Sequence, residues 1–395
     1  MTTAATLRAI PRGVWALGLV SMFMDVSSEM VHALLPVFLV SVLGAGTVAV
    51  GIIEGVAEAT ASITKIFSGA LSDRLGKRKA LAVAGYGLAA LTKPIFPLAS
   101  TVGWVMVARF LDRIGKGIRG APRDALVADI TPAHLRGASF GLRQSLDTIG
   151  AFAGPMLAMA LMLWSGDDFR LVFWVAVVPA VLAVVVLVVG VHEPAPTGAA
   201  TARPPLRLAE PRRLPAACWR LLGLAAVLGL ARFGEAFLVL RAFEAGLAAA
   251  WAPLVLVAMN VVYMLTAYPA GAWSDRFGRH GMVAAGVAAL LAADVLLAVA
   301  GGLWAVMAGV ALWGLHMGLT QGLLAALVAD AAPPALRGTA FGGFHFTAGV
   351  TALLASVAAG WLWQVYGAPA TFAAGALVAV PALVGLLAAM RRPAA

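Results

Sequence analysis

Ionisable residues lie inside runs of this chain that are otherwise apolar, and several recur at helical spacing. Asp25, Glu29 and His32 stand at positions i, i+4 and i+7, which places them on one face of a helix. Insertion of an acid or base at mid-membrane depth costs about 2.5–3.5 kcal/mol, so such residues mark proton relays or solute sites. The candidates chosen on this ground are Asp25, Glu29, His32, Glu54, Glu58, Arg109, Asp112, Arg113, Arg232 and Glu235.

A purely structural interpretation of the same charges stays open. Acids in the first two apolar runs could neutralise bases in the fourth, because buried charges are normally paired. We favour this reading for the bases nearest the expected cytoplasmic end, which are Lys65, Lys116, Arg119 and Arg123. Asp25 and Arg109 lie deeper, and both readings remain open there. Arg232 and Glu235 are one turn apart and are expected to pair locally.

The elements that must position these residues are membrane helices. The chain of 395 residues is 62% hydrophobic and 12% charged, with a mean hydropathy of +0.94. Soluble domains are about 45–50% apolar and about 25% charged. The composition therefore predicts an integral membrane protein.

Several other classes of protein are excluded by the same reading. One cysteine rules out an intrachain disulfide, and no Cys/His cluster has the spacing of a zinc site. No glycine-rich lysine loop for nucleotide phosphates is present, and no nucleophile–base set suggests an enzyme. The net charge of +10 lies mostly in short loops, as expected for a membrane protein rather than a nucleic-acid binder. We expect no cofactor.

The apolar segments predict twelve membrane-spanning helices, with both chain ends in the cytoplasm. Loops rich in Lys and Arg alternate with loops that lack them, apart from Arg170, and the basic loops face the cytoplasm. The proline-rich segment 192–218 reads as a cytoplasmic linker between two six-helix domains, 1–191 and 219–395. At about 20 residues per span, the predicted spans are 14–41, 46–71, 79–100, 103–121, 139–164, 170–191, 219–244, 250–273, 280–301, 303–327, 339–364 and 367–390.

Two loop sequences recur and indicate that the two domains are duplicates. GALSDRLGKRKAL at 69–81 returns as GAWSDRFGRHGMV at 271–283, and ADITPAHLRGASFG at 128–141 returns as ADAAPPALRGTAFG at 329–342. The offsets are nearly the same, so the whole six-helix unit repeats. Transporters built from parallel repeats bind solute at mid-membrane, at the repeat interface.

The first of these loops resembles the G-x-L-x-D-R-x-G-R/K-R/K loop of the major facilitator superfamily. The resemblance implies an all-α fold of twelve helices in two pseudo-symmetric bundles, and it is strongest for bacterial and archaeal efflux-type permeases. It implies that Asp73 helps to latch the two halves on the cytoplasmic side. The second copy departs from the pattern, so its latch is expected to be weaker. The predicted gating residues are Gly69, Asp73, Arg74, Gly76, Asp275, Arg276 and Gly278.

Two further features resemble the antiporter branch of that superfamily. Gly150, Gly154 and Pro155 match its G-x-x-x-G-P signature, in which glycines allow close packing and proline bends the helix. Arg109 matches a membrane-embedded arginine that the family links to proton transfer. Arg113 stands where the family has a glycine.

These observations predict a proton-coupled secondary transporter of a small organic solute, acting as a monomeric exporter in the cytoplasmic membrane. Asp25 is the first choice for the proton carrier, Glu29 the second, and Arg109 the group that tunes it. Proton-coupled uptake of an organic anion is one alternative. Divalent-metal transport is another, through Asp25, His32, His316 and His345.

Overall fold

The computed structural model describes residues 9–75, 77–193, 214–333 and 336–390. These residues form helices and no strand. The long helices of the first half are α2 (Arg12–Ser41), α3 (Thr47–Leu75), α4 (Arg78–Thr92), α6 (Val102–Ile130), α7 (Arg136–Ser165) and α8 (Phe169–Gly190), with the short α5 (Ile95–Leu98) after α4. The second half contains α9 (Ala216–Ala231), α10 (Ala236–Glu244), α11 (Pro253–Phe277), α12 (Arg279–Val299), α13 (Leu303–Ala331), α14 (Arg337–Tyr366) and α15 (Ala368–Met390).

The helices confirm the predicted all-α membrane fold. In the described part of the chain, eleven helical segments are long and apolar enough to cross a membrane. The remaining predicted span, the fourth at 103–121, is also a helix, α6, but it carries the cationic stripe and continues through Pro122 to Ile130. The seventh predicted span, 219–244, differs more, because it is interrupted between Ala231 and Ala236 and forms α9 and α10.

The chain divides into two packing units. Unit 1 comprises residues 1–35 and 60–206, and unit 2 comprises residues 36–59 and 207–395. The end of α2 and the first part of α3 therefore pack with the second half of the sequence. Most of the predicted linker 192–218 lies outside the described residues, so the predicted domain organisation stays a prediction.

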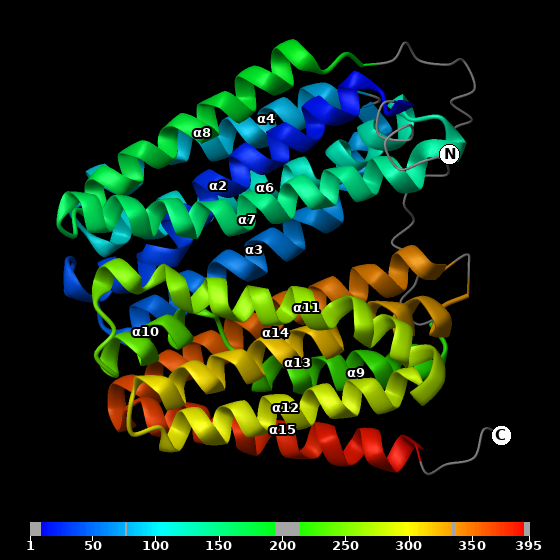
Figure 1. Ribbon diagram of the computed structural model, residues 1–395. Coiled ribbons are helices and arrows are strands. Elements are labelled where there is room, and N and C mark those ends of the chain that lie inside the picture. The colour runs from blue at the N-terminus through cyan, green and yellow to red at the C-terminus, as the bar shows by residue number, and fades with distance from the viewer. Residues whose placement is uncertain (1–8, 76, 194–213, 334–335, 391–395) are drawn as a thin grey trace. The chain divides into compact units, whose positions relative to one another are not determined.

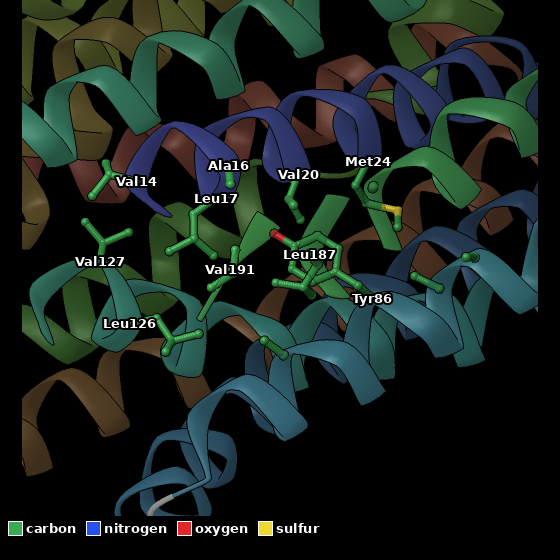
Figure 2. Close-up of a cluster of buried hydrophobic side chains, with 14 of the residues drawn as sticks. Val14, Ala16, Leu17, Val20, Met24, Tyr86, Leu126, Val127, Leu187 and Val191 are labelled. Atoms are coloured by element: carbon green, nitrogen blue, oxygen red, sulfur yellow. The ribbon is translucent and has the colours of Figure 1, made fainter. Parts of the chain in front are cut away.

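Unit 1 is built around an apolar cluster contributed by four helices (Figure 2). In this cluster Val14 of α2 lies opposite Val127 of α6, and Val20 of α2 lies next to Tyr86 of α4. The other labelled members are Ala16, Leu17, Met24, Leu126, Leu187 and Val191. Figure 1 shows these helices running alongside one another. The cluster fixes the register of α2 against α4 and α6. Six of the membrane candidates lie on α2 and α6: Asp25, Glu29, His32, Arg109, Asp112 and Arg113.

An aromatic cluster around Phe233 lies at the centre of unit 2. Phe233, between α9 and α10, lies with its ring centroid 5.4 Å from that of Trp313 and 5.3 Å from that of Phe372. Phe237 and Trp363 extend the cluster at 5.6 Å. Aromatic pairs at these separations stabilise a core by about 0.5–1.5 kcal/mol beyond the area they bury. The interruption of the seventh span is thus packed into the centre of unit 2.

Matching ion pairs occur in the two units and give the sequence repeat a structural meaning. In unit 1, Arg78 at the start of α4 pairs with Asp129 at the end of α6. In unit 2, Arg279 at the start of α12 pairs with Asp330 at the end of α13. Both residues of the second pair stand 201 positions after those of the first. The recurring Asp is therefore a partner for the arginine that opens the third helix of each half.

Candidate functional site

The charged stripe of α6 is brought inside unit 1 by close packing against α4. A Cβ added to Gly115 would lie 2.7 Å from the carbonyl oxygen of Gly85, and one added to Gly85 would lie 2.8 Å from that of Gly115. The two backbones can approach so closely only because both positions are glycine. As a result four charged residues of α6 are buried, with exposed fractions of 2–5%: Arg109, Asp112, Arg113 and Arg119.

Asp112 is the centre of a buried ion pair. Its Oδ1 lies 2.9 Å from the ammonium Nζ of Lys93, and its Oδ2 lies 3.5 Å from Nε of Arg113. Lys93 also donates to the Oγ of Ser28 on α2, at 3.1 Å. Arg109 is among the further cations that act on Asp112. The predicted residues Arg109, Asp112 and Arg113 therefore belong to one network.

Lys93 is a central member of this network that the sequence analysis did not single out. It is the C-cap of α4, it is 1% exposed, and it stands between α4 and α5 with the ring of Phe96 at 6.0 Å. The available signal was a lysine followed by proline inside a predicted span. A buried lysine requires a counter-charge, and Asp112 provides it.

The predicted face of α2 carries a second group of carboxylates. Glu29 lies with Oε2 3.5 Å from Nδ1 of His32, so these two predicted residues are neighbours. Asp25 of α2 and Asp147 of α7 are neighbours whose carboxyl groups interact. The cations that act on Asp25 are Lys116 and Arg119 of α6. Two carboxyl groups can share a hydrogen bond only when one of them carries a proton.

Asp147 was also missed by the sequence analysis. It lies in LDTIG, one turn before Gly150, at the start of the glycine motif. Its Oδ1 lies 3.8 Å from Nη1 of Arg123 and 3.7 Å from Nη1 of Arg143. Arg123 also donates to the Oγ of Ser21 at 3.1 Å. Asp147 thus connects the arginines of α6 and α7 to Asp25 on α2.

The glycine motif of α7 holds these carboxylates in place. A Cβ at Gly150 would lie 2.5 Å from the carbonyl oxygen of Met22 and 3.1 Å from Cβ of Asp25. One at Gly154 would lie 2.9 Å from Cβ of Glu29. Pro155 follows inside the same uninterrupted helix. The motif therefore lets α7 lie directly against the acidic face of α2.

The remaining membrane candidates lie in unit 2, around the interruption of the seventh span. Arg232 is the C-cap of α9, and Glu235 is the N-cap of α10. Gly234 between them donates its backbone N–H to Oγ of Ser356 on α14 at 3.1 Å, and a Cβ on Gly234 would lie 3.3 Å from Cβ of Glu54. Glu54 is 3% exposed, whereas Glu58 is exposed. The local pairing of Arg232 with Glu235 stays a prediction.

The metal alternative gains no support from the described residues. In that part of the chain no group of three or more His, Cys, Asp or Glu is arranged to hold a metal ion. Nδ1 of His316 lies 2.8 Å from the carbonyl oxygen of Gly286, so this histidine makes a hydrogen bond between α13 and α12.

Most of the predicted gating residues, or their side chains, lie outside the part of the chain that the structure describes. Gly76 is outside the described residues, and so are the side chains of Asp73, Arg74, Asp275 and Arg276 and the surroundings of Gly69. Gly278 is described, and its φ of 77° is a backbone conformation that favours glycine. The role of these residues as a cytoplasmic latch stays a prediction.

Comparison with known proteins places the chain among transporters. The sequence model of the Major Facilitator Superfamily matches residues 17–257 and 241–395. The MFS-type transporter MJ1317 of Methanocaldococcus jannaschii is 30% identical over 390 residues, which cover 94% of each chain. The multidrug resistance protein MdtH of Proteus mirabilis is 31% identical over 185 residues, 47% of this chain and 44% of its own. The crystal structure of the nucleoside transporter NupG superimposes with a TM-score of 0.78 at 14% identity, covering 96% of this chain and 99% of its own.

Proposed function

Because the chain belongs to the Major Facilitator Superfamily, and is thus a multi-pass membrane transporter and not an enzyme, we propose that it exports a small organic solute in exchange for protons. Transport proceeds by alternating access of a site in the membrane. We further propose that the protein acts in the cytoplasmic membrane with both ends in the cytoplasm, because the basic loops alternate as that orientation requires.

The observation that supports proton coupling is the carboxyl pair Asp25 and Asp147. A hydrogen bond between them requires one proton for two carboxyl groups, and repulsion between two neighbouring anions opposes loss of that proton. Lys116 and Arg119 favour the ionised form. The pair thus combines a second acid with neighbouring cations, including Arg123 and Arg143 beside Asp147, and this is the arrangement that we propose for a proton carrier.

Coupling follows when the solute changes this balance. Exchange requires that solute and proton exclude each other. The cationic group of a zwitterionic solute that binds beside the carboxyl pair stabilises its ionised form and displaces the proton. Protonation of the pair in turn displaces the solute. Solute and proton thus influence each other's binding, and such influence is reciprocal. In this scheme Arg109 tunes the network through Asp112, and Glu29 is the second candidate for the carrier.

Export is favoured by two independent features. One is similarity to multidrug resistance proteins named MdtH, over about half of this chain or less. The other is the Gly150–Pro155 signature of the antiporter branch, which in this chain packs against Asp25 and Glu29. No observation favours uptake in the same way.

The test is transport by Asp25→Asn in liposomes. A thermal-shift screen of the purified protein against organic anions, organic cations and metals first provides a ligand, because binding raises the melting temperature. We then expect Asp25→Asn to bind that ligand and to lose accumulation driven by a pH difference alone. Asp147→Asn is expected to behave similarly.

Asp167→Asn is the matched control, because Asp167 is an exposed acid outside the network and its φ of 67° is tolerated by asparagine. It should transport like the wild type. Continued uphill accumulation by Asp25→Asn at the wild-type rate would contradict the assignment of the carrier.

A further inference from the structure

Asp294 is a buried acid in unit 2 that the proposed function does not use. It lies on α12 with none of its surface exposed, and neither carboxylate oxygen has a hydrogen-bond partner among the described residues. A Cβ on Gly375 of α15 would lie 2.7 Å from Oδ2 of Asp294, 3.2 Å from Cε1 of Phe233 and 3.3 Å from the carbonyl oxygen of Ala231. The carboxyl group therefore faces the interruption between α9 and α10.

The surroundings of Asp294 are apolar and closely packed. The ring of Phe233 belongs to the aromatic cluster with Trp313 and Phe372, both of which have no exposed surface. The indole Nε1 of Trp313 is likewise buried without a partner among the described residues. A carboxylate in such a setting loses its hydration without compensation, and an isolated buried charge usually neutralises instead.

No ion pair relieves that cost in the described part of unit 2. α15 contributes no charged residue there. On α10, Arg241 donates to the carbonyl oxygens of Leu297 and Ala300, at 3.1 and 2.8 Å, and lies 3.8 Å from Glu244. On α13, His316 contacts Gly286, and Asp330 pairs with Arg279.

The other ionisable groups on neighbouring elements are Arg220, Arg232, Glu235, Tyr263, Asp275, Arg276 and His280, and the side chains of Asp275 and Arg276 are outside the description.

The internal repeat supplies an independent argument. Asp294 and Trp313 stand 201 positions after Lys93 and Asp112, the offset that also relates the two terminal ion pairs. In unit 1 this position pair is a buried salt bridge at 2.9 Å. In unit 1 the acid, Asp112, is on the fourth helix, whereas in unit 2 the acid, Asp294, is on the third. The position that matches Asp112 is occupied by the neutral indole of Trp313. The repeat thus provides a neutral N–H donor where unit 1 provides a charge.

We propose that Asp294 is a second proton-binding residue, which carries its proton in the packed conformation and faces the carbonyl group of Ala231 across Gly375. Ala231 is the last residue of α9, and carbonyls at a helix end have no partner within their helix. A protonated carboxyl group donates to such an oxygen and stays uncharged. Ionisation would set two oxygens with negative charge against each other and would draw water towards the α9–α10 interruption.

The role of Asp294 in transport rests on the proposed function, but its protonation does not, so the two are separable. The probe is the infrared spectrum of the purified full-length protein, without solute and without a gradient. We expect the wild type at neutral pH to show the carbonyl stretch of a protonated carboxyl group that is missing in Asp294→Asn and present in Asp25→Asn. The band should disappear at alkaline pH. Identical spectra for the wild type and Asp294→Asn in this region would overturn the proposal, as would ionised-carboxylate bands that respond to sodium.

A second pair of variants leaves the acid in place in case Asp294→Asn does not fold. Gly375→Ala inserts a methyl group against Oδ2 and should shift the frequency of the band. Gly385→Ala on the same helix meets no atom within 4 Å and should leave it unchanged. No difference between these two variants would contradict the position proposed for the proton. A neutral Asp294 contributes fully to stability only below the ordinary pKa of aspartate, about 4, and the contribution is lost as pH rises from there until Asp294 ionises in the folded protein. Asp294→Asn should therefore melt with a weaker dependence on pH above about 4 than the wild type.

Discussion

The third and fourth helices of the two units share the ion pair at their ends but differ in the residues buried between them. In both units the third helix begins with an arginine paired to an aspartate at the end of the fourth, Arg78 with Asp129 and Arg279 with Asp330. Between those helices unit 1 buries the Lys93–Asp112 salt bridge. Unit 2 buries Asp294, an acid without a partner among the described residues, beside an aromatic cluster. The duplicated frame is thus kept by contacts at its ends, while its centre has diverged.

The far ends of the third helices show the same separation of frame from content. Arg170 of α8 donates to the carbonyl oxygens of Pro97 and Ala99, at 2.6 and 3.1 Å. Arg241 of α10 donates to those of Leu297 and Ala300. Each arginine satisfies carbonyls that a helix end leaves without partners, although the two arginines come from different helices. Both units thus supply an arginine to the carbonyl oxygens at this helix end, but the arginine comes from a different helix in each unit.

Breaking the salt bridge of unit 1 should have the largest effect on stability. Asp112→Asn leaves the ammonium of Lys93 buried without its counter-charge, which costs about 3–5 kcal/mol of the free energy of unfolding. Denaturant unfolding of the purified protein in detergent measures the loss. The double variant Lys93→Met with Asp112→Leu removes both charges and should recover most of it. If the double variant is as unstable as the single one, the pair contributes through its shape and not through its charge.

Substituting the glycines at close helix contacts should cause the second-largest loss of stability. We expect the nature of the clash to differ between the two units. Gly150→Ala sets a methyl group 2.5 Å from the backbone oxygen of Met22, which cannot move independently of α2. We expect a loss of about 1–3 kcal/mol, typical of overpacking. Gly141→Ala on the same helix meets nothing within 4 Å and is the control.

In unit 2 the corresponding clash is with a side chain. A Cβ on Gly229 of α9 would meet the hydroxyl and Cβ of Thr351 on α14. Gly229→Ala should therefore be rescued by Thr351→Ala, whereas no single side-chain change should rescue Gly150→Ala. The measurement is the melting temperature of Gly150→Ala, Gly141→Ala, Gly229→Ala and the double variant Gly229→Ala with Thr351→Ala. If Thr351→Ala does not restore the melting temperature of Gly229→Ala, the two units do not differ in this respect.

Most of the membrane helices could be predicted from the sequence, because local composition decides where a membrane helix forms. A run of about 20 apolar residues must be helical in lipid, since its backbone groups have no other partners. The interruption of the seventh span could not be predicted in this way. Arg232 to Glu235 leave the helix because the N–H of Gly234 is satisfied by Ser356, which is 122 positions later in the chain. The sequence shows three glycines in the predicted span, Gly223, Gly229 and Gly234, and does not mark which of them lies at the break.

The site was predicted where acids repeat at helical spacing, as at Asp25 and Glu29, and was missed where the partner lies on another helix. Lys93 stands at a helix end before a proline, Asp147 lies among polar residues at the start of the glycine motif, and Asp294 is a single acid in a long apolar run. Local periodicity marks none of the three. Their importance comes from burial and from neighbours, which helix packing decides.

Removing the paired arginines at the helix starts should have the smallest effect, and it tests whether the two frames are equivalent. The side chains of Arg78 and Asp129 are 23% and 42% exposed, and those of Arg279 and Asp330 are 35% and 62% exposed. Exposed ion pairs contribute about 0.2–1 kcal/mol, and salt screens them. Arg78→Gln should cost slightly more than Arg279→Gln, because its pair is less exposed and the arginine also donates to the carbonyl oxygen of Ala125 at 3.2 Å. Unfolding measured at low and high salt should bring both variants closer to the wild type as salt rises. A loss at either position as large as that of Asp112→Asn would mean that the helix ends, and not the buried centres, carry most of the stability of the repeat.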